Sequence, residues 1–272
     1  MDYYLILALA AYVTGAVGFF GHLLAGNTAW HRIGHAFFLG GLVCQTLVIF
    51  SELAGTGFLP VGTLRDSLAF AAWALALVYA ALDLRYRVMV LGAAVAPIAA
   101  GTLMAALFLP VEPAARPDLL KSAWTFFHVL PVFVGDAAFL LAALVGAAYL
   151  VQERAIKKKR RGFSFNRMPP LDTLDRLGYA CVVLGFAFLT VGLVSGFVYA
   201  KSAWGRWWSG DPKEVWSLVT WLLYAALLHE RLAVGWRGRR AALLAICGAA
   251  VILFTFLGLN LLLLGHHGQF AG

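Results

Sequence analysis

The feature that most constrains this chain is a series of apolar runs, each close to the length that a helix needs to cross a bilayer. The first run, DYYLILALAAYVTGAVGFF, begins at Asp2, and similar runs recur along all 272 residues. About 20 apolar residues form a transmembrane helix, and a bilayer admits only helices and closed barrels. Because the runs are continuous and do not alternate, they predict helices.

Composition agrees with this interpretation. Hydrophobic residues make up 62% of the chain and charged residues 12%, whereas about 25% of a soluble domain is charged. We therefore predict an all-α, polytopic membrane bundle of about eight transmembrane helices. The first run shows no clear signal-peptide pattern and is expected to be retained. The expected spans are residues 3–21, 33–51, 66–82, 88–109, 123–151, 176–199, 214–231 and 241–264.

Basic residues predict the orientation, because cytoplasmic loops carry an excess of Lys and Arg. Most of the 21 Lys and Arg residues fall on one set of alternate loops, including KKKRR at 157–161. That side is predicted to be cytoplasmic, which places both termini outside. The KKKRR run is interpreted as a topology anchor that touches anionic membrane lipid, and no nucleic acid is expected as a partner.

The chain is predicted to be a single integral membrane domain, residues 1–272. It divides in sequence into a five-span part (1–151), a basic cytoplasmic linker (152–175) and a three-span part (176–272). The linker contains Pro169 and Pro170 and is expected to be irregular. The fifth span is too long for one straight crossing, so its first turns are expected at or outside the membrane surface.

The stretch SAWGRWWSGDPKEVW, residues 202–216, is unusual between two apolar spans. Its glycines favour turns, whereas Asp211 and Pro212 suit the N-cap and first position of a helix. The orientation rule places this loop outside, and Trp216 then lies on the seventh span. Trp is enriched at membrane interfaces, so an aromatic belt is the simplest interpretation of these residues.

The clustering of tryptophans with charges of both signs favours a second interpretation, a surface for a flat ligand. Indole faces stack on conjugated rings, and Arg206 or Lys213 would meet carboxylates. A porphyrin with two propionates has this chemistry. Asp211 is expected to fix the loop and not to act as a base. The stacking platform is predicted to consist of Trp204, Trp207, Trp208 and Trp216.

Three histidines lie near the same predicted outer face. His128 is close to the outer end of the fifth span, and His266 and His267 follow the outer end of the eighth. Haem iron takes imidazole as an axial ligand. Imidazoles on either side of the aromatic platform would form a bis-histidine haem site.

The other histidines lie toward the predicted inner face. His229 is near the inner end of the seventh span, and ionisable residues at membrane depth are functional candidates. His22 and His31 are interpreted as snorkelling loop residues. His31 and His35 lie four residues apart and share a helix face. For His35, two interpretations stay open: a structural hydrogen bond, or a contribution to an inner haem site with His229.

These residues resemble the CcsA/ResC-type cytochrome c biogenesis proteins, which belong to the haem-handling WWD group. The family motif resembles W-G-x-x-W-x-W-D-P-K-E-x-W, and residues 204–216 read WGRWWSGDPKEVW. Gly210 stands where the family usually has tryptophan. Further similar stretches are GFLPVGTLRDSLAF at 57–70, HVLPVFVGDAAFLLA from His128, TWLLYAALLHER with His229, and GLNLLLLGHH, in which His267 matches better than His266.

The resemblance implies a function in system II cytochrome c maturation in the bacterial cytoplasmic membrane. The family receives haem b from the cytoplasmic side and holds it at the external, periplasmic face, where the WWD loop lies. There haem is attached to apocytochrome c through thioethers to a CxxCH motif. The resemblance implies His128 and His267 as outer ligands to haem iron and His229 as a membrane ligand.

The resemblance also implies a membrane partner of the CcsB/ResB type, which commonly supplies the histidine opposite His229. The chain would then be one component of a cytochrome c synthase, or haem lyase, complex, and whether it is itself an enzyme stays open. CcmF-type synthases are far longer and CcmC-type proteins, which load haem onto a carrier, have fewer spans. A haem-free membrane protein and a paralogue that regulates haem synthesis are the remaining alternatives, and Gly210 keeps the paralogue open.

Overall fold

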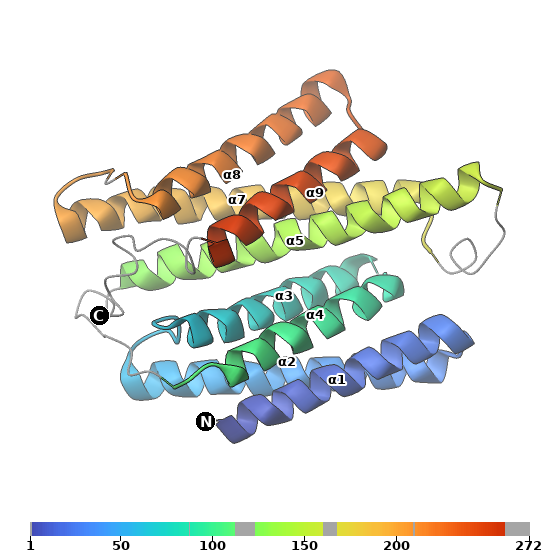
Figure 1. The fold of residues 1–272 in the computed structure, drawn as a ribbon, viewed down its shortest axis with the longest axis horizontal. Coiled ribbons are helices and arrows are strands. Elements are labelled where there is room, and N and C mark those ends of the chain that lie inside the picture. Colours follow the sequence, from blue (N-terminus) through green and yellow to red (C-terminus); the bar gives the residue numbers. More distant parts are fainter. Residues whose placement is uncertain (1, 87, 112–122, 160–167, 209, 259–272) are drawn as a thin grey trace. The chain divides into compact units, whose positions relative to one another are not determined.

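The computed structural model describes residues 2–86, 88–111, 123–159, 168–208 and 210–258, and helices account for nearly all of them (Figure 1). The short π-helical turns η2 (Glu230–Val234) and η3 (Phe254–Gly258) continue two of the helices. The α-helices are α1 (Asp2–Ala25), α2 (Thr28–Thr56), α3 (Leu64–Tyr86), α4 (Met89–Phe108), α5 (Ala123–Lys157), α7 (Leu171–Trp204), α8 (Pro212–His229) and α9 (Arg239–Leu253).

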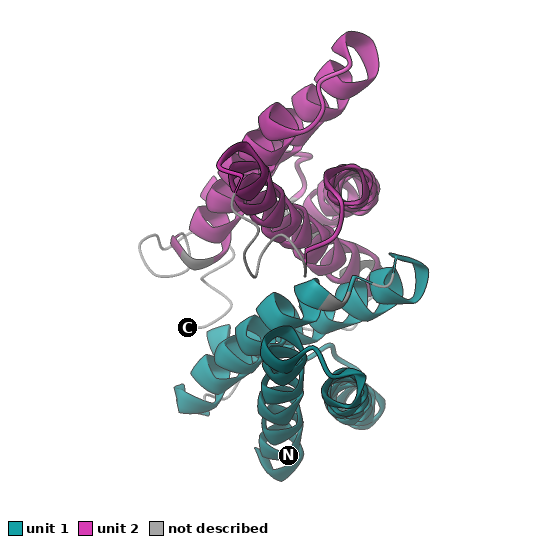
Figure 2. Cartoon of the chain, turned by 90° about the vertical axis from the view of Figure 1, so that its right-hand side faces the viewer, with its two compact units in different colours: residues 1–114 teal, residues 115–272 magenta. Residues whose placement is uncertain are grey.

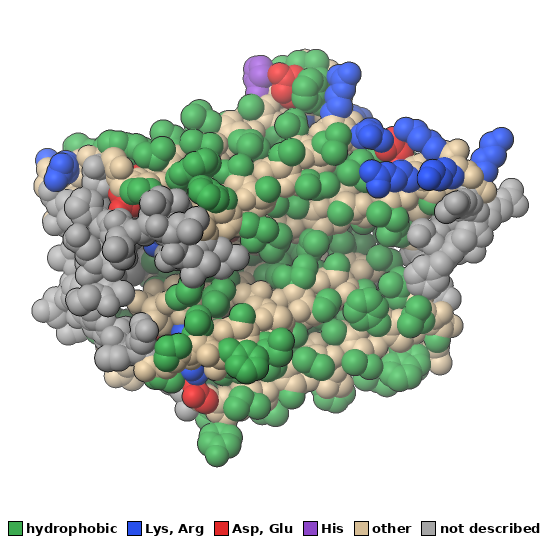
Figure 3. Space-filling view, viewed as in Figure 1, with side chains coloured by type: hydrophobic (Ala, Val, Ile, Leu, Met, Phe, Trp, Pro, Cys, Tyr) green, Lys and Arg blue, Asp and Glu red, His purple; other side chains and the backbone are tan. Residues whose placement is uncertain are grey.

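Within this part of the chain, 8 helices are long and apolar enough to cross a membrane. The predicted all-α, multi-pass membrane fold is therefore confirmed. On the face drawn in Figure 3, hydrophobic side chains cover the middle of the helices, and Lys and Arg side chains gather toward helix ends. Apolar helices with basic ends are typical of membrane-spanning proteins.

The chain forms two compact units, residues 1–114 and 115–272, coloured separately in Figure 2. The first holds α1 to α4, and the second holds α5 to α9. The sequence divides at the basic linker, after the fifth span, whereas packing groups α5 with the last three spans. α5 packs along α7 and also contacts α9, so the fifth span belongs to the core of the second unit.

In the first unit, α1 and α2 approach closely because glycines face each other. A Cβ atom on Gly18 would lie 2.4 Å from the Cα atom of Gly34. Small residues at such positions allow the close backbone contact that stabilises helix pairs in membranes. Farther along the same helix pair, the Tyr12 hydroxyl donates a 2.9 Å hydrogen bond to the Gln45 side chain, which is fully buried.

Several helices are longer than the apolar runs that predict them, and two predictions are corrected as a result. Residues 152–157 and 171–175 of the expected irregular linker are helical. Ion pairs one turn apart, Lys157 with Glu153 and Arg176 with Asp172, support these polar turns, and hydropathy does not detect them. His22 and His31 lie in α1 and α2 and not in a loop.

Candidate functional site

One end of the second unit brings together the segments that carry the predicted outer site. The Ser195 hydroxyl in α7 donates to the Phe127 carbonyl near the start of α5. Trp216 at the start of α8 contacts Phe254 in η3, with ring centroids 4.8 Å apart. The beginnings of α5 and α8 and the ends of α7 and α9 therefore meet at one end, on the left in Figure 1.

His128 lies at this end, on the first turns of α5, against a glycine face of α7. Its Nδ1 atom is 2.8 Å from the carbonyl oxygen of Gly192. The Cε1 atom of its ring is so close to Gly196 that a Cβ atom there would lie 2.8 Å away. Histidines that bind metals commonly engage one ring nitrogen with a carbonyl, which fixes the tautomer. Iron ligation by His128 would therefore use Nε2.

The Trp-rich loop contacts the same turn of α7 as this histidine. The Trp208 ring packs against Phe197 at a centroid distance of 6.1 Å, and Phe197 follows Gly196, which contacts His128. The Trp207 and Trp208 side chains keep 58% and 41% of their surface exposed. Two large indole rings with exposed surface provide an area on which a flat ligand would stack.

The charged residues of the loop hold its backbone. The Asp211 side chain is the N-cap of α8 and accepts a 2.8 Å hydrogen bond from the Lys213 N–H, with Pro212 at the first helical position. This confirms the predicted helix start. The Glu214 carboxylate accepts from the Gly210 N–H at 3.1 Å, and Gly210 has a φ of +76°. A tryptophan there would be strained in this left-handed conformation, so Gly210 suits the observed turn.

Three predicted site residues are described partly or not at all. His266 and His267 lie outside the described residues, and so does the Trp204 side chain. Arg206 is exposed in the loop, whereas Lys213 is half-buried. α9 and η3 end at this face, as Trp216 and Phe254 indicate.

His229 is the last residue of α8, at the opposite end of the same unit from the Trp-rich loop. Its side chain is exposed, and it completes an exposed helix face with spacings of four and three residues. This outer face of α8 consists of Val215, Val219, Leu222, Ala226 and His229. Residues at these intervals share one side of a helix, so His229 points out of its own unit.

His35 has a carboxylate partner inside the first unit. Its Nε2 atom lies 3.3 Å from the Asp83 carboxylate in α3, and the two side chains are 31% and 9% exposed. The rings of His22, His31 and His35 follow one another at centroid distances of 5.3 and 5.9 Å. This arrangement favours the structural interpretation of His35. Its proposed pairing with His229 joins two different units and remains a hypothesis.

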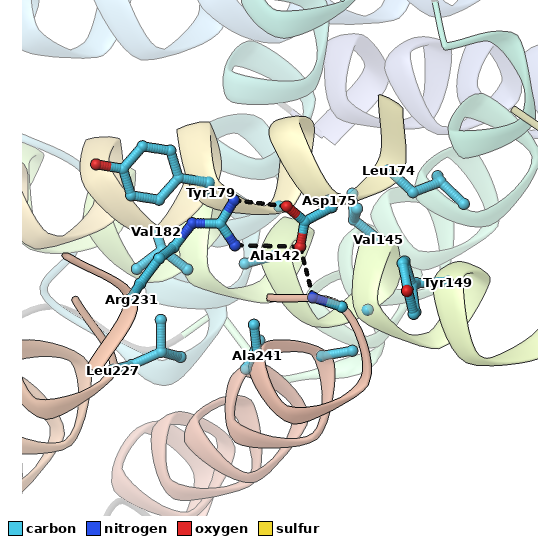
Figure 4. Close-up of a pocket in the computed structure, with 15 residues that line it drawn as sticks. Ala142, Val145, Tyr149, Leu174, Asp175, Tyr179, Val182, Leu227, Arg231 and Ala241 are labelled. Carbon is cyan, nitrogen blue, oxygen red and sulfur yellow. Dashed lines mark hydrogen bonds and ion pairs between the residues drawn. The ribbon is translucent and has the colours of Figure 1, made fainter. Parts of the chain in front are cut away.

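The sequence interpretation overlooked an ion pair close to His229. Arg231 in η2 and Asp175 in α7 form two hydrogen bonds at 3.1 and 2.6 Å, and both residues line a pocket between α5, α7, α8 and α9 (Figure 4). The pocket has a volume of about 30 Å³, enough for one or two waters and too small for a porphyrin. In the sequence, this ion pair is indicated only by Asp175 before one apolar run and Arg231 after another.

The amino-acid sequence of this chain is similar to those of known proteins. Residues 61–267 match the family model described as cytochrome C assembly protein. The chain is 37% identical over 244 residues to the cytochrome c biogenesis protein CcsA of Parasynechococcus marenigrum (strain WH8102), with 80% of each chain covered. It is 34% identical over 270 residues to CcsA of Synechococcus elongatus (strain ATCC 33912 / PCC 7942 / FACHB-805), with 83% of each covered.

A solved structure shares the fold at lower sequence identity. It is cytochrome c haem lyase CcmF, which matches with a TM-score of 0.66 and 18% identity over 94% of this chain. The match spans 46% of the CcmF chain, so the present chain is similar to about half of that longer protein. At this identity the likeness concerns the helical fold alone.

Proposed function

The chain belongs to the cytochrome c assembly family as a CcsA-type protein of cytochrome c maturation, and from this premise we propose that it holds haem b for attachment to apocytochrome c. Haem is the substrate in this proposal. The protein acts mainly through position and electrostatics, because the reactive vinyl groups belong to haem. Its place is the bacterial cytoplasmic membrane, with the WWD loop on the periplasmic side.

One observation carries the proposal: His128 and the exposed Trp208 of the loop contact neighbouring residues of α7. His128 packs on Gly196, and Trp208 packs on Phe197. The Gly192 carbonyl holds the Nδ1 side of the imidazole. An oriented histidine and an exposed indole against the same turn of α7 suit iron ligation and stacking on one porphyrin.

At this outer site, we assign His128 and His267 as the axial ligands, with His266 as the alternative to His267. Trp204, Trp207, Trp208 and Trp216 form the platform. Arg206 and Lys213 offer positive charge to the two propionates. The carboxylates of Asp211 and Glu214 bind backbone N–H groups of the loop, which supports a loop-fixing role for Asp211.

The attachment step adds each cysteine S–H of the CxxCH motif across a haem vinyl group, and no atom is lost. The protein keeps the vinyl carbons at the external face while the apocytochrome binds. The histidine of the CxxCH motif then replaces one axial ligand, so one of the two iron–histidine bonds must be exchangeable.

A second, inner haem position is part of the proposal, with His229 as one ligand. The outward direction of His229 suits a ligand supplied by another membrane protein, which we propose is of the CcsB/ResB type. The outer face of α8 is apolar along its length, so a transmembrane helix of that partner would pack there. His35 is not needed in this arrangement, since it binds Asp83.

The test is the absorption spectrum of the purified protein, oxidised and reduced, compared with a His128→Ala/His267→Ala double variant. We expect a Soret band and sharp reduced α and β bands in the parent protein. The double variant should lose or broaden these bands, because the outer iron loses both imidazoles. The matched control is His22→Ala, which removes a histidine of the first unit and should leave the outer spectrum unchanged.

A colourless parent protein, even after haem is supplied during expression, would overturn the proposal and favour a haem-free membrane protein. An unchanged spectrum in the double variant would instead reject His128 and His267 as the ligands. Thioether formation on a co-expressed apocytochrome c, detected by haem staining after denaturing electrophoresis, would then separate haem attachment from haem storage.

A further inference from the structure

An ion pair connects three segments at the end of the second unit that carries His229. The Asp175 carboxylate accepts hydrogen bonds from Nη1 and Nη2 of Arg231 at 3.1 and 2.6 Å. The same carboxylate accepts from the Gly238 N–H at 2.8 Å (Figure 4). The Arg231 guanidinium also lies 4.5 Å from the centre of the Tyr179 ring. α7, η2 and the start of α9 are therefore held at one point.

This pair differs from the other ion pairs nearby in its burial. The Arg231 and Asp175 side chains are 10% and 13% exposed, whereas Arg176 and Asp172, which lie on either side of Asp175 along α7, are 67% and 74% exposed. Exposed pairs contribute little to stability. A buried bidentate pair fixes the orientation of its two side chains more strongly than an exposed pair does, because the planar guanidinium and carboxylate must align.

The anchored residue lies two positions after His229, where the helix changes its winding. α8 ends at His229, and η2 begins at Glu230. Residues two apart on a helix point about 200° apart, so an inward Arg231 directs His229 outward. Leu227, two residues before His229, is buried and lines the same pocket as Arg231. Both neighbours therefore hold the helix with His229 on the exposed side.

We propose that Asp175 is a positioning residue for His229: through Arg231 it fixes the π-helical turn after α8 and directs the imidazole toward the inner haem. The role toward haem rests on the proposed function. The clamp itself, which we define as Asp175, Arg231 and the Gly238 N–H, rests on contacts within one unit. π-helical turns are rare and are found frequently at functional sites.

The first experiment measures the direction of residue 229 without haem. Cys44, Cys181 and Cys247 are replaced by serine, and His229→Cys is labelled with a nitroxide in the full-length protein. We expect Asp175→Asn to give a more mobile spectrum and a changed accessibility to lipid-soluble oxygen. Asp172→Asn is the matched control, because it removes an exposed ion pair from the same helix and should leave the label unchanged.

The second experiment measures haem binding at His229. In a His128→Ala/His267→Ala background, hemin is titrated into the full-length protein and the Soret band is followed. Loss of a hydrogen-bond partner of a metal-binding histidine weakens affinity about 10- to 100-fold. Asp175 acts on His229 through Arg231, so we expect Asp175→Asn to weaken hemin binding by up to about 10-fold. The double variant Asp175→Asn/Arg231→Gln leaves no unpaired charge. If the orientation of His229 determines hemin affinity, this variant should lose as much affinity as Asp175→Asn.

The outcomes separate the clamp from the haem role. An unchanged nitroxide spectrum in a folded Asp175→Asn protein overturns the positioning role. A changed nitroxide spectrum with hemin affinity that does not depend on His229 rejects the inner haem ligand and with it the role toward haem. Normal affinity in Asp175→Asn/Arg231→Gln would attribute the single variant's defect to the unpaired arginine and would also overturn the proposal.

Discussion

At the scale of single residues, the contact between His128 and α7 depends on the absence of side chains. Gly196 leaves space for the imidazole, and the Gly192 carbonyl lies 2.8 Å from Nδ1. Because Nδ1 is engaged by this carbonyl, the His128 ring at the start of α5 has only Nε2 left for a ligand. The group that orients His128 is a backbone carbonyl. A sequence motif of side chains therefore cannot identify it.

Gly196→Ala tests this contact. The added Cβ would lie 2.8 Å from Cε1 and 3.0 Å from Nδ1 of His128, so the ring must move and weaken its bond to Gly192. We expect about 10- to 100-fold weaker outer haem binding, measured by hemin titration. Gly101→Ala is the control, since nothing lies within 4 Å of its Cβ position. Equal affinity of the two variants would refute the orienting role of this surface.

At the scale of helices, backbone proximity holds α1 against α2. A Cβ at Gly18 would meet Gly34 Cα at 2.4 Å and Gly34 N at 2.5 Å, and backbone atoms of a helix cannot rotate away as a side chain does. Interfaces of this kind rely on van der Waals contact, because lipid offers no hydrophobic driving force between helices.

Gly18→Ala should therefore destabilise the first unit by about 1–3 kcal/mol, the usual cost of overpacking. Thermal or denaturant unfolding in a mild detergent measures this change. Gly40→Ala on α2 is the matched control, because its Cβ position is open and alanine favours a helix by up to about 1 kcal/mol over glycine. If both variants unfold alike, close packing of α1 on α2 does not limit stability.

At the scale of the molecule, the second unit has an aromatic end and a basic end. The Trp-rich loop lies between α7 and α8, whereas Lys157, Arg231 and Arg239 lie where α5 and α8 end and α9 begins. Since basic residues favour the cytoplasmic side, this polarity predicts a periplasmic Trp-rich loop. The proposed presentation of haem to apocytochrome c requires this orientation.

Cysteine labelling tests the orientation in intact cells. In a cysteine-free background, Ser202→Cys at the end of α7 should react with a membrane-impermeant maleimide. Lys158→Cys, just after α5, should react only after the membrane is permeabilised. Both positions are exposed, so access to solvent is matched. The reverse pattern would place the Trp-rich loop in the cytoplasm and would contradict haem presentation to a periplasmic partner.

The number and order of the helices were predictable from the amino-acid sequence, whereas several helix ends were not. Each apolar run must satisfy its own backbone hydrogen bonds in a bilayer, so composition along a short window suffices to identify a helix. The N-cap at Asp211 with Pro212 is equally local. Polar turns beyond the bilayer, such as residues 152–157, escaped prediction because hydropathy identifies only the apolar part of a helix.

The partners of the functional candidates depend on packing between segments far apart in the chain. His128 meets Gly192, His35 meets Asp83, and Asp175 meets Arg231. Each pair requires two helices to approach with a particular rotation about their axes, and hydropathy carries no information on that rotation. Residue types could therefore nominate His128 and His229, whereas helix packing determined which nitrogen His128 presents and which way His229 points.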